Sequence, residues 1–107
     1  MITEWRKLTF STDELAAAIT TYLLATRGMA KDDRLGGVAI TDPHNVAVTV
    51  TIYPAVSGEP SSVELKAEAL AALMVAHCIR TRTPLPRRAT KSIVVDDDRV
   101  ALVLSMA

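Results

Sequence analysis

Two matching helix-start motifs constrain the fold of this chain most strongly. Ser11–Glu14 and Ser61–Glu64 each place a serine three residues before a glutamate. In this spacing, the capping box, the serine oxygen accepts from the backbone N–H of the glutamate, whose carboxylate accepts in return from the N–H of the serine. Each motif precedes a stretch with helical apolar spacing and then two stretches typical of β-strands. The pattern predicts the order α-β-β-α-β-β.

The first half of the chain fits this order in detail. The first helix should run from Ser11 until Gly28, since glycine is common just beyond a helix C-cap. The next segments, Val38–Ile40 and Val46–Tyr53, are expected to be strands, and the second alternates between valine or isoleucine and smaller or more polar residues. Residues 1–9 predict an arm or a short edge strand.

The second half repeats the order. We expect a helix from Ser61 to about Arg80, and residues 69–79 are apolar on nearly every side, which is typical of a central helix. Pro84 and Pro86 prevent its continuation. The stretches 92–95 and 100–106 are expected to form two strands joined by a hairpin at 96–99.

The two halves have matching apolar patterns. When the first half of the sequence is shifted onto the second by a constant number of residues, Leu15 falls on Leu70 and Val38 falls on Ile93. This agreement indicates either an internal duplication, with repeats at about 11–53 and 61–106, or chance similarity between two αββ units with similar loops. Each unit alone is too small to bury its apolar face. We therefore expect one α+β domain, 1–107, with a four-stranded antiparallel sheet and two helices packed on one face.

The other face of that sheet should be nearly free of charge. Exposed sheet faces usually carry charged side chains, so an uncharged face suggests a cover: the N-terminal arm, a second copy of the chain or another partner. The alternative is a solvated face rich in threonine and serine. The residues concerned are Ala39, Ala47, Thr49, Thr51, Ala101, Val103 and Ser105, of which Thr49, Thr51 and Val103 are the candidate oligomer contacts.

Composition limits the classes of function. The 107 residues are 50% hydrophobic but only 4% aromatic, so the core must be aliphatic, and the apolar surplus favours an oligomer interface. A formal net charge of zero argues against strong nonspecific binding to nucleic acid or membranes. The single cysteine allows no internal disulfide, and neither a secretory signal nor a membrane-spanning stretch is recognisable. We expect a cytoplasmic protein with no membrane partner.

A basic segment follows the second helix. It contains five of the twelve basic residues: Arg80, Arg82, Arg87, Arg88 and Lys91. Prolines stiffen the chain between them, and arginines on a stiff segment can present forked donors to phosphates or carboxylates. The segment predicts an anion, phosphate or acidic-partner site, or else a solvated connection favoured by the helix C-terminus. It indicates nucleic acid only weakly, because it contains no aromatic residue for base stacking.

An acidic pair lies opposite part of this segment in the shifted alignment. Asp32 and Asp33 fall on Arg87 and Arg88. If the halves are related by a pseudo-twofold axis, two copies could meet with acidic loop against basic loop. The alternative is coincidence between two polar loops.

The sequence offers little for catalysis. His77 and Cys78 are neighbours on a helix and point about 100° apart, so a packed thiol and a structural histidine are favoured. The run Asp96–Asp98 lacks the spacing of a calcium loop and is expected to be a hairpin turn. We predict no metal, no cofactor and no catalytic residue. The favoured function is a small homo-oligomeric or accessory interaction module; the alternatives are an anion or nucleic-acid binder using the basic segment and a small enzyme of unknown type.

Overall fold

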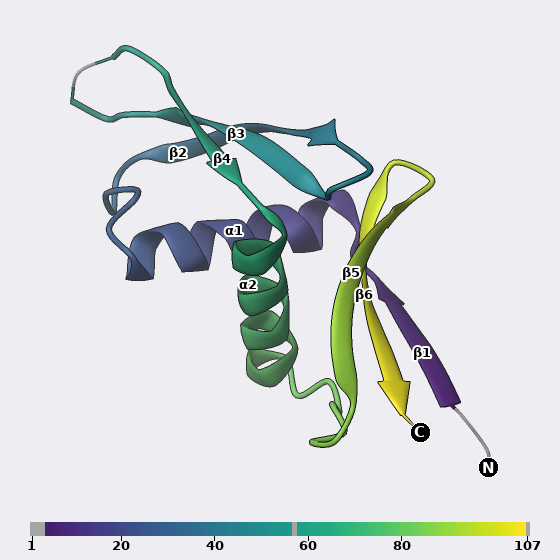
Figure 1. Cartoon of the computed structure of the whole chain (residues 1–107). Coiled ribbons are helices and arrows are strands. Elements are labelled where there is room, and N and C mark those ends of the chain that lie inside the picture. Colours follow the sequence, from purple (N-terminus) through teal and green to yellow (C-terminus); the bar gives the residue numbers. More distant parts are fainter. Residues whose placement is uncertain (1–3, 57, 107) are drawn as a thin grey trace.

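The chain folds into two helices and two separate antiparallel sheets (Figure 1). The structure is a computed structural model that describes residues 4–56 and 58–106. One sheet has the strand order β1-β6-β5 and the other the order β2-β3-β4. The elements are β1 (Glu4–Thr9), α1 (Thr12–Ala25), β2 (Arg34–Asp42), β3 (Ala47–Tyr53), β4 (Ser61–Leu65), α2 (Ala67–Arg80), β5 (Thr90–Asp96) and β6 (Arg99–Met106).

This arrangement corrects the predicted fold class, because a single four-stranded sheet does not form. The class α+β holds, but the element order is β-α-β-β-β-α-β-β. The two predicted hairpins, β2–β3 and β5–β6, are present, yet each takes a third strand from elsewhere in the chain. β4 pairs with β3, and β1 pairs with β6. β3 and β6 are therefore the central strands of two separate sheets.

The prediction that a helix begins at Ser61 was wrong, because residues 61–65 form the strand β4. Ser61–Glu64 has the spacing of a capping box but lies in β4, where Val63 pairs with Val50 and Leu65 with Val48. Alternation buries Leu65 and half-buries Val63 on the inner face. The helix α2 begins at Ala67 instead, and the side chain of its N-cap, Lys66, makes no capping hydrogen bond. Pairing with β3 outweighs the local helix signal.

The beginning of the chain matches the sequence more closely. β1 is an edge strand, as one of the two alternatives for residues 1–9 predicted. Phe10 then donates its backbone N–H to the carbonyl of Val100 at 3.0 Å. The capping box at Ser11 is confirmed: its Oγ accepts from the N–H of Glu14 at 3.1 Å, and the carboxylate of Glu14 faces the N–H of Ser11 at 3.4 Å.

Both helices end in the same motif, with an arginine in the left-handed position. Arg27 has φ 63° and Arg82 has φ 57°. The residues that follow them, Gly28 and Thr83, donate their N–H groups back to Leu23 and Cys78, each at 2.8 Å. This is a Schellman ending, which usually has glycine at the left-handed position. Gly28 therefore lies one residue beyond its predicted place, and the backbone at Arg82 is held in a defined turn.

The core is one continuous cluster shared by both sheets and both helices. Figure 1 shows α1 along the β2-β3-β4 sheet and α2 beside β5. The largest fully buried side chains of the core are Ile19, Leu70, Leu73, Met74, Leu102 and Leu104, with Val48, Val50 and Val100. The core is aliphatic, as the composition requires, apart from Phe10. Within the described residues, neither helix has the length and apolarity needed to cross a membrane.

The predicted uncharged sheet face is divided between the two sheets. Thr49 and Thr51 lie on the outer face of β3, whereas Val103 lies on the outer face of β6. All three side chains are half-buried. An ion pair between Lys7 and Asp96 joins the strands that flank β6, on the same face as Val103. The two faces cannot act as one contact surface, and one of them carries charge.

Candidate functional site

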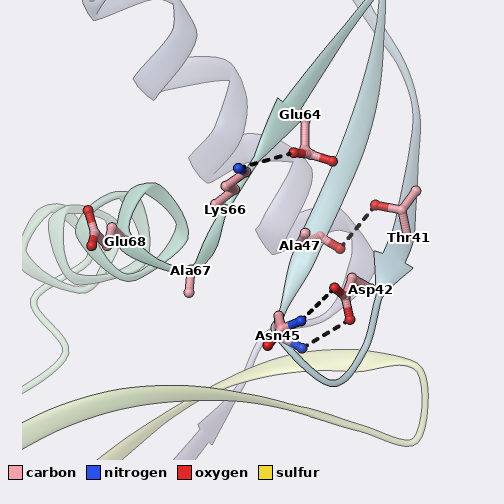
Figure 2. A pocket seen from close by; sticks show the side chains of 8 residues that line it. All are labelled: Thr41, Asp42, Asn45, Ala47, Glu64, Lys66, Ala67 and Glu68. Atoms are coloured by element: carbon pink, nitrogen blue, oxygen red, sulfur yellow. Dashed lines mark hydrogen bonds and ion pairs between the residues drawn. The ribbon is translucent and has the colours of Figure 1, made fainter.

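A hollow lies at the end of the β2-β3-β4 sheet where α2 begins (Figure 2). Its volume is about 750 Å³. Glu64 and Lys66 form a long ion pair at 4.0 Å across one side, and Asp42 binds Asn45 on the other. The lining residues are Thr41, Asp42, Asn45, Ala47, Glu64, Lys66, Ala67 and Glu68.

Two polar residues of this hollow, Asp42 and Asn45, stabilise the turn between β2 and β3. The carboxylate of Asp42 accepts from the backbone N–H of Asn45 at 3.0 Å and from its side-chain amide at 2.9 Å. The backbone hydrogen bond from Asn45 is the main cause that lowers the pKa of Asp42, so this carboxyl stays ionised. Val46 follows in the left-handed region, φ 57°, while its side chain is buried. The ionisable side chains in the described lining of this hollow are Asp42, Glu64, Lys66 and Glu68.

A second, smaller hollow of about 260 Å³ contains His77 and Cys78. Burial, and secondarily the charge of Glu14, raises the pKa of the Cys78 thiol. A protonated thiol is a poor nucleophile. The His77 ring packs against Phe10 at a centroid distance of 5.4 Å. Cys78 is itself buried in the core. The described residues also bring no three metal-ligating side chains together, and Asp97 and Asp98 form the two-residue turn of the β5–β6 hairpin.

The basic segment leaves α2 through two tight turns. Arg80 is the last residue of the helix, and Arg82 is the left-handed residue beyond it. The N–H of Ala89 then donates to the carbonyl of Pro86 at 3.2 Å, which places Arg87 and Arg88 at the two central positions of a β-turn. Ala89 is buried and anchors this turn to the core. The arginines thus stand on a backbone fixed on both sides.

The cations of this segment are exposed and lack acidic partners. Arg80, Arg82, Arg87, Arg88 and Lys91 are all exposed. The ion pairs among the described residues are Lys7–Asp96 and Lys66–Glu64, and neither involves the segment. Lys91 makes one long hydrogen bond, at 3.4 Å, to the carbonyl of Ala89. The sequence contains no acidic residue between Glu68 and Asp96, so the segment is locally cationic although the whole chain is neutral.

Strand pairing adds β1 to this region. Trp5 pairs with Ser105, and Ser105 pairs in turn with Thr90 at the start of β5. In the next row, Arg6 pairs with Leu104 and Leu104 with Lys91. Figure 1 shows the start of β1, the end of β6 and the connection after α2 at one end of the molecule. We name this region the basic end and define it by six exposed cations: Arg6, Arg80, Arg82, Arg87, Arg88 and Lys91.

The acidic pair of the shifted alignment has a different place. Asp32 and Asp33 lie in the connection between α1 and β2, and Arg87 and Arg88 lie in the connection between α2 and β5. Figure 1 shows these two connections well apart. The carboxylate of Asp33 accepts from the N–H of Ala55 at 3.0 Å and from that of Ala30 at 2.9 Å. These bonds, chiefly the one from Ala55, lower the pKa of Asp33. Asp33 thus ties the loop after β3 to the turn before β2, within one molecule.

Replacing Asp33 with asparagine should destabilise the protein at neutral pH. An amide offers one accepting oxygen, so one of the two N–H groups loses its partner. Because the folded pKa of Asp33 lies below its ordinary value of 3.8, the carboxylate stabilises the fold above that pH and loses this effect as the pH falls further. The melting temperature of the variant should fall below wild type at pH 7, and the difference should shrink as the pH is lowered below 3.8.

Asp32→Asn is the matched control, since Asp32 makes no hydrogen bond among the described residues and should give no comparable loss at neutral pH. Equal losses for the two variants at neutral pH would contradict the role given to Asp33.

Comparison with known proteins leaves this region to be interpreted from its own chemistry. No protein family, curated protein or solved structure matches the chain. Sequence analysis found five of the six cations of the basic end but missed Arg6, and it did not connect Trp5 with them. Only the pairing of β1 with β6 brings these two residues to the segment.

Proposed function

We propose that the protein is a binding module that holds an anionic partner at its basic end. One observation carries this proposal: six exposed cations gather at one end of a neutral molecule, and none forms an ion pair with a described acidic side chain. Like charges held close together repel one another, and an anion between them removes that repulsion.

The backbone that holds these arginines supports the proposal. The Schellman turn at Arg82 and the β-turn at Arg87 and Arg88 limit the motion of the chain. A planar guanidinium on a fixed backbone loses less conformational entropy when it forms a paired hydrogen bond with a phosphate or carboxylate. The basic end therefore suits recognition of an anion better than a flexible lysine-rich tail would.

Self-association is the second candidate, and an apolar strip on the outer face of β1-β6-β5 favours it. Trp5 is 75% exposed and Val94 is 36% exposed, and Val103 lies on the same face. A second copy of the chain could cover this strip. The charge-steered contact predicted from Asp32 and Asp33 is less well supported, because Asp33 is already engaged within its own molecule.

Binding of the whole protein to two polyanions, heparin and oligo-glutamate, tests the proposal. We expect binding at low salt, and the affinity should fall at least tenfold between roughly 50 and 200 mM salt. Binding releases the counterions held by the polyanion, and this release is less favourable when the salt concentration is higher. Light scattering on the same samples measures the mass. Absence of binding to both polyanions at low salt would refute the proposal, and a stable dimer without such binding would favour the second candidate.

A further inference from the structure

We infer that the anionic partner is a single-stranded nucleic acid, whose phosphates lie along the basic end while a base stacks on Trp5. This inference rests on the proposed function and names its partner class. It follows from a juxtaposition that the strand pairing creates: the only tryptophan of the chain lies beside a cationic segment that contains no aromatic residue of its own.

The pairing register fixes the distance between the two features. Trp5, Ser105 and Thr90 form one row across β1, β6 and β5. Trp5 and Thr90 are thus separated by two interstrand spacings, about 10 Å. The turn with Arg87 and Arg88 ends at Ala89, immediately before Thr90. An extended strand of a few nucleotides can therefore reach the indole and the arginines at the same time.

The exposure of Trp5 is unusual for its residue type. Tryptophan is highly buried on average, yet this side chain is 75% exposed on the outer face of an edge strand. It borders a shallow hollow of about 280 Å³ together with Arg6, Lys7, Val94 and Val103. The wall opposite the indole is thus apolar, while Lys7 at its rim is paired with Asp96. A flat base suits this apolar wall, and the cations for its phosphates that are unpaired among the described residues are those of the Arg87–Arg88 turn.

The same features favour single strands over other anions. In a duplex the bases are stacked inside and cannot reach an indole, whereas unpaired bases stack on aromatic side chains and their phosphates follow a cationic groove. An acidic peptide would use the cations but leave the exposed indole without a role. Because the stacking of a base on an aromatic ring tolerates every base, we expect little sequence preference.

Removing the indole while keeping the cations tests the inference. Binding of oligo(dT) and oligo(U), each of about 12 nucleotides, is compared with binding of a duplex of equal length and of oligo-glutamate. Trp5→Ala should weaken binding of the single strands about tenfold and leave oligo-glutamate unchanged, and Trp5→Phe should restore most of the loss. Tyr53→Ala is the matched control, since Tyr53 is an exposed aromatic (46%) on the outer face of the other sheet.

Tryptophan fluorescence gives a second, direct readout, because the chain contains one tryptophan. Stacking of a base should quench this fluorescence in the wild-type protein and in Tyr53→Ala. Quenching by either oligonucleotide supports the inference, and the tighter of the two identifies DNA or RNA as the preferred ligand.

The outcomes separate this inference from the proposed function. If polyanions bind but Trp5→Ala changes no affinity and the fluorescence is not quenched, the single-strand inference is overturned while the anion-binding function stands. Oligo-glutamate bound more tightly than the single strands would also overturn it and indicate an acidic protein partner. If no polyanion binds at all, both proposals fail.

Discussion

Replacing Leu102 with alanine is expected to lower the free energy of unfolding by about 2–5 kcal/mol. Leu102 is fully buried on β6, the central strand of its sheet, and it pairs with Leu8 on one side and Ile93 on the other. The substitution leaves a cavity in the middle of this apolar row. Since a small domain has a total stability of about 5–15 kcal/mol, the variant should unfold at much lower denaturant concentration.

Val103→Ala is the matched control on the next residue. Val103 points to the outer face, is half-buried, and pairs with Lys7 and Ser92. Its truncation should cost about 1 kcal/mol or less. A shift of the β6 register by one residue would exchange the inner and outer faces. A larger loss for Val103→Ala than for Leu102→Ala, measured by urea unfolding, would therefore contradict this sheet.

Local sequence signals predicted the elements whose stability is local. The capping box at Ser11, the alternation of 47–53 and the hairpin at 96–99 depend on residues close together in the chain, and all three are confirmed; the predicted strand start at Val46 was one residue early, because Val46 lies in the left-handed turn. The helix boundary at Ser61 was wrong because the spacing from Ser61 to Glu64 fits a helix start, while the alternation of Val63 and Leu65 fits a strand. Pairing with Val50 and Val48 decides between them.

The division into two sheets could not be read from local patterns. A two-strand hairpin with one apolar face needs a further strand or a helix against it, and the sequence does not say which segment supplies it. β6 takes β1 from the other end of the chain, and β3 takes β4 from the segment predicted as helix. These choices depend on contacts between distant residues.

The candidate site shows the same limit. Arg80, Arg82, Arg87, Arg88 and Lys91 are visible as a cluster because they are close in sequence. Trp5 and Arg6 join them only through the pairing of β1 with β6. The weak point of the nucleic-acid hypothesis, the lack of an aromatic residue in the segment, was therefore a property of the segment and not of the folded surface.

Reversing two charges at the basic end should have the largest effect on binding. Arg87→Glu combined with Arg88→Glu removes two of the six cations and replaces them with carboxylates. Each cation that neutralises a phosphate of a single strand contributes about 0.7 to the slope of log affinity against log salt. Two lost contacts, with added repulsion, should weaken binding of oligo(dT) about a hundredfold at roughly 50 mM salt. Because both side chains are exposed turn residues, stability should change by about 0.5 kcal/mol or less.

A second double reversal separates a local site from overall charge. Lys31→Glu with Arg34→Glu changes two exposed cations beside the other sheet. In each double variant, the charge of two residues changes from +1 to −1. Both variants therefore carry the same net charge, about −4, starting from +0. Long-range repulsion of a polyanion should be similar in the two proteins, and the difference in affinity between them reports contacts at the basic end. Equal weakening by both pairs would mean that the protein repels or attracts anions only through its total charge, and the basic end would then not be a site.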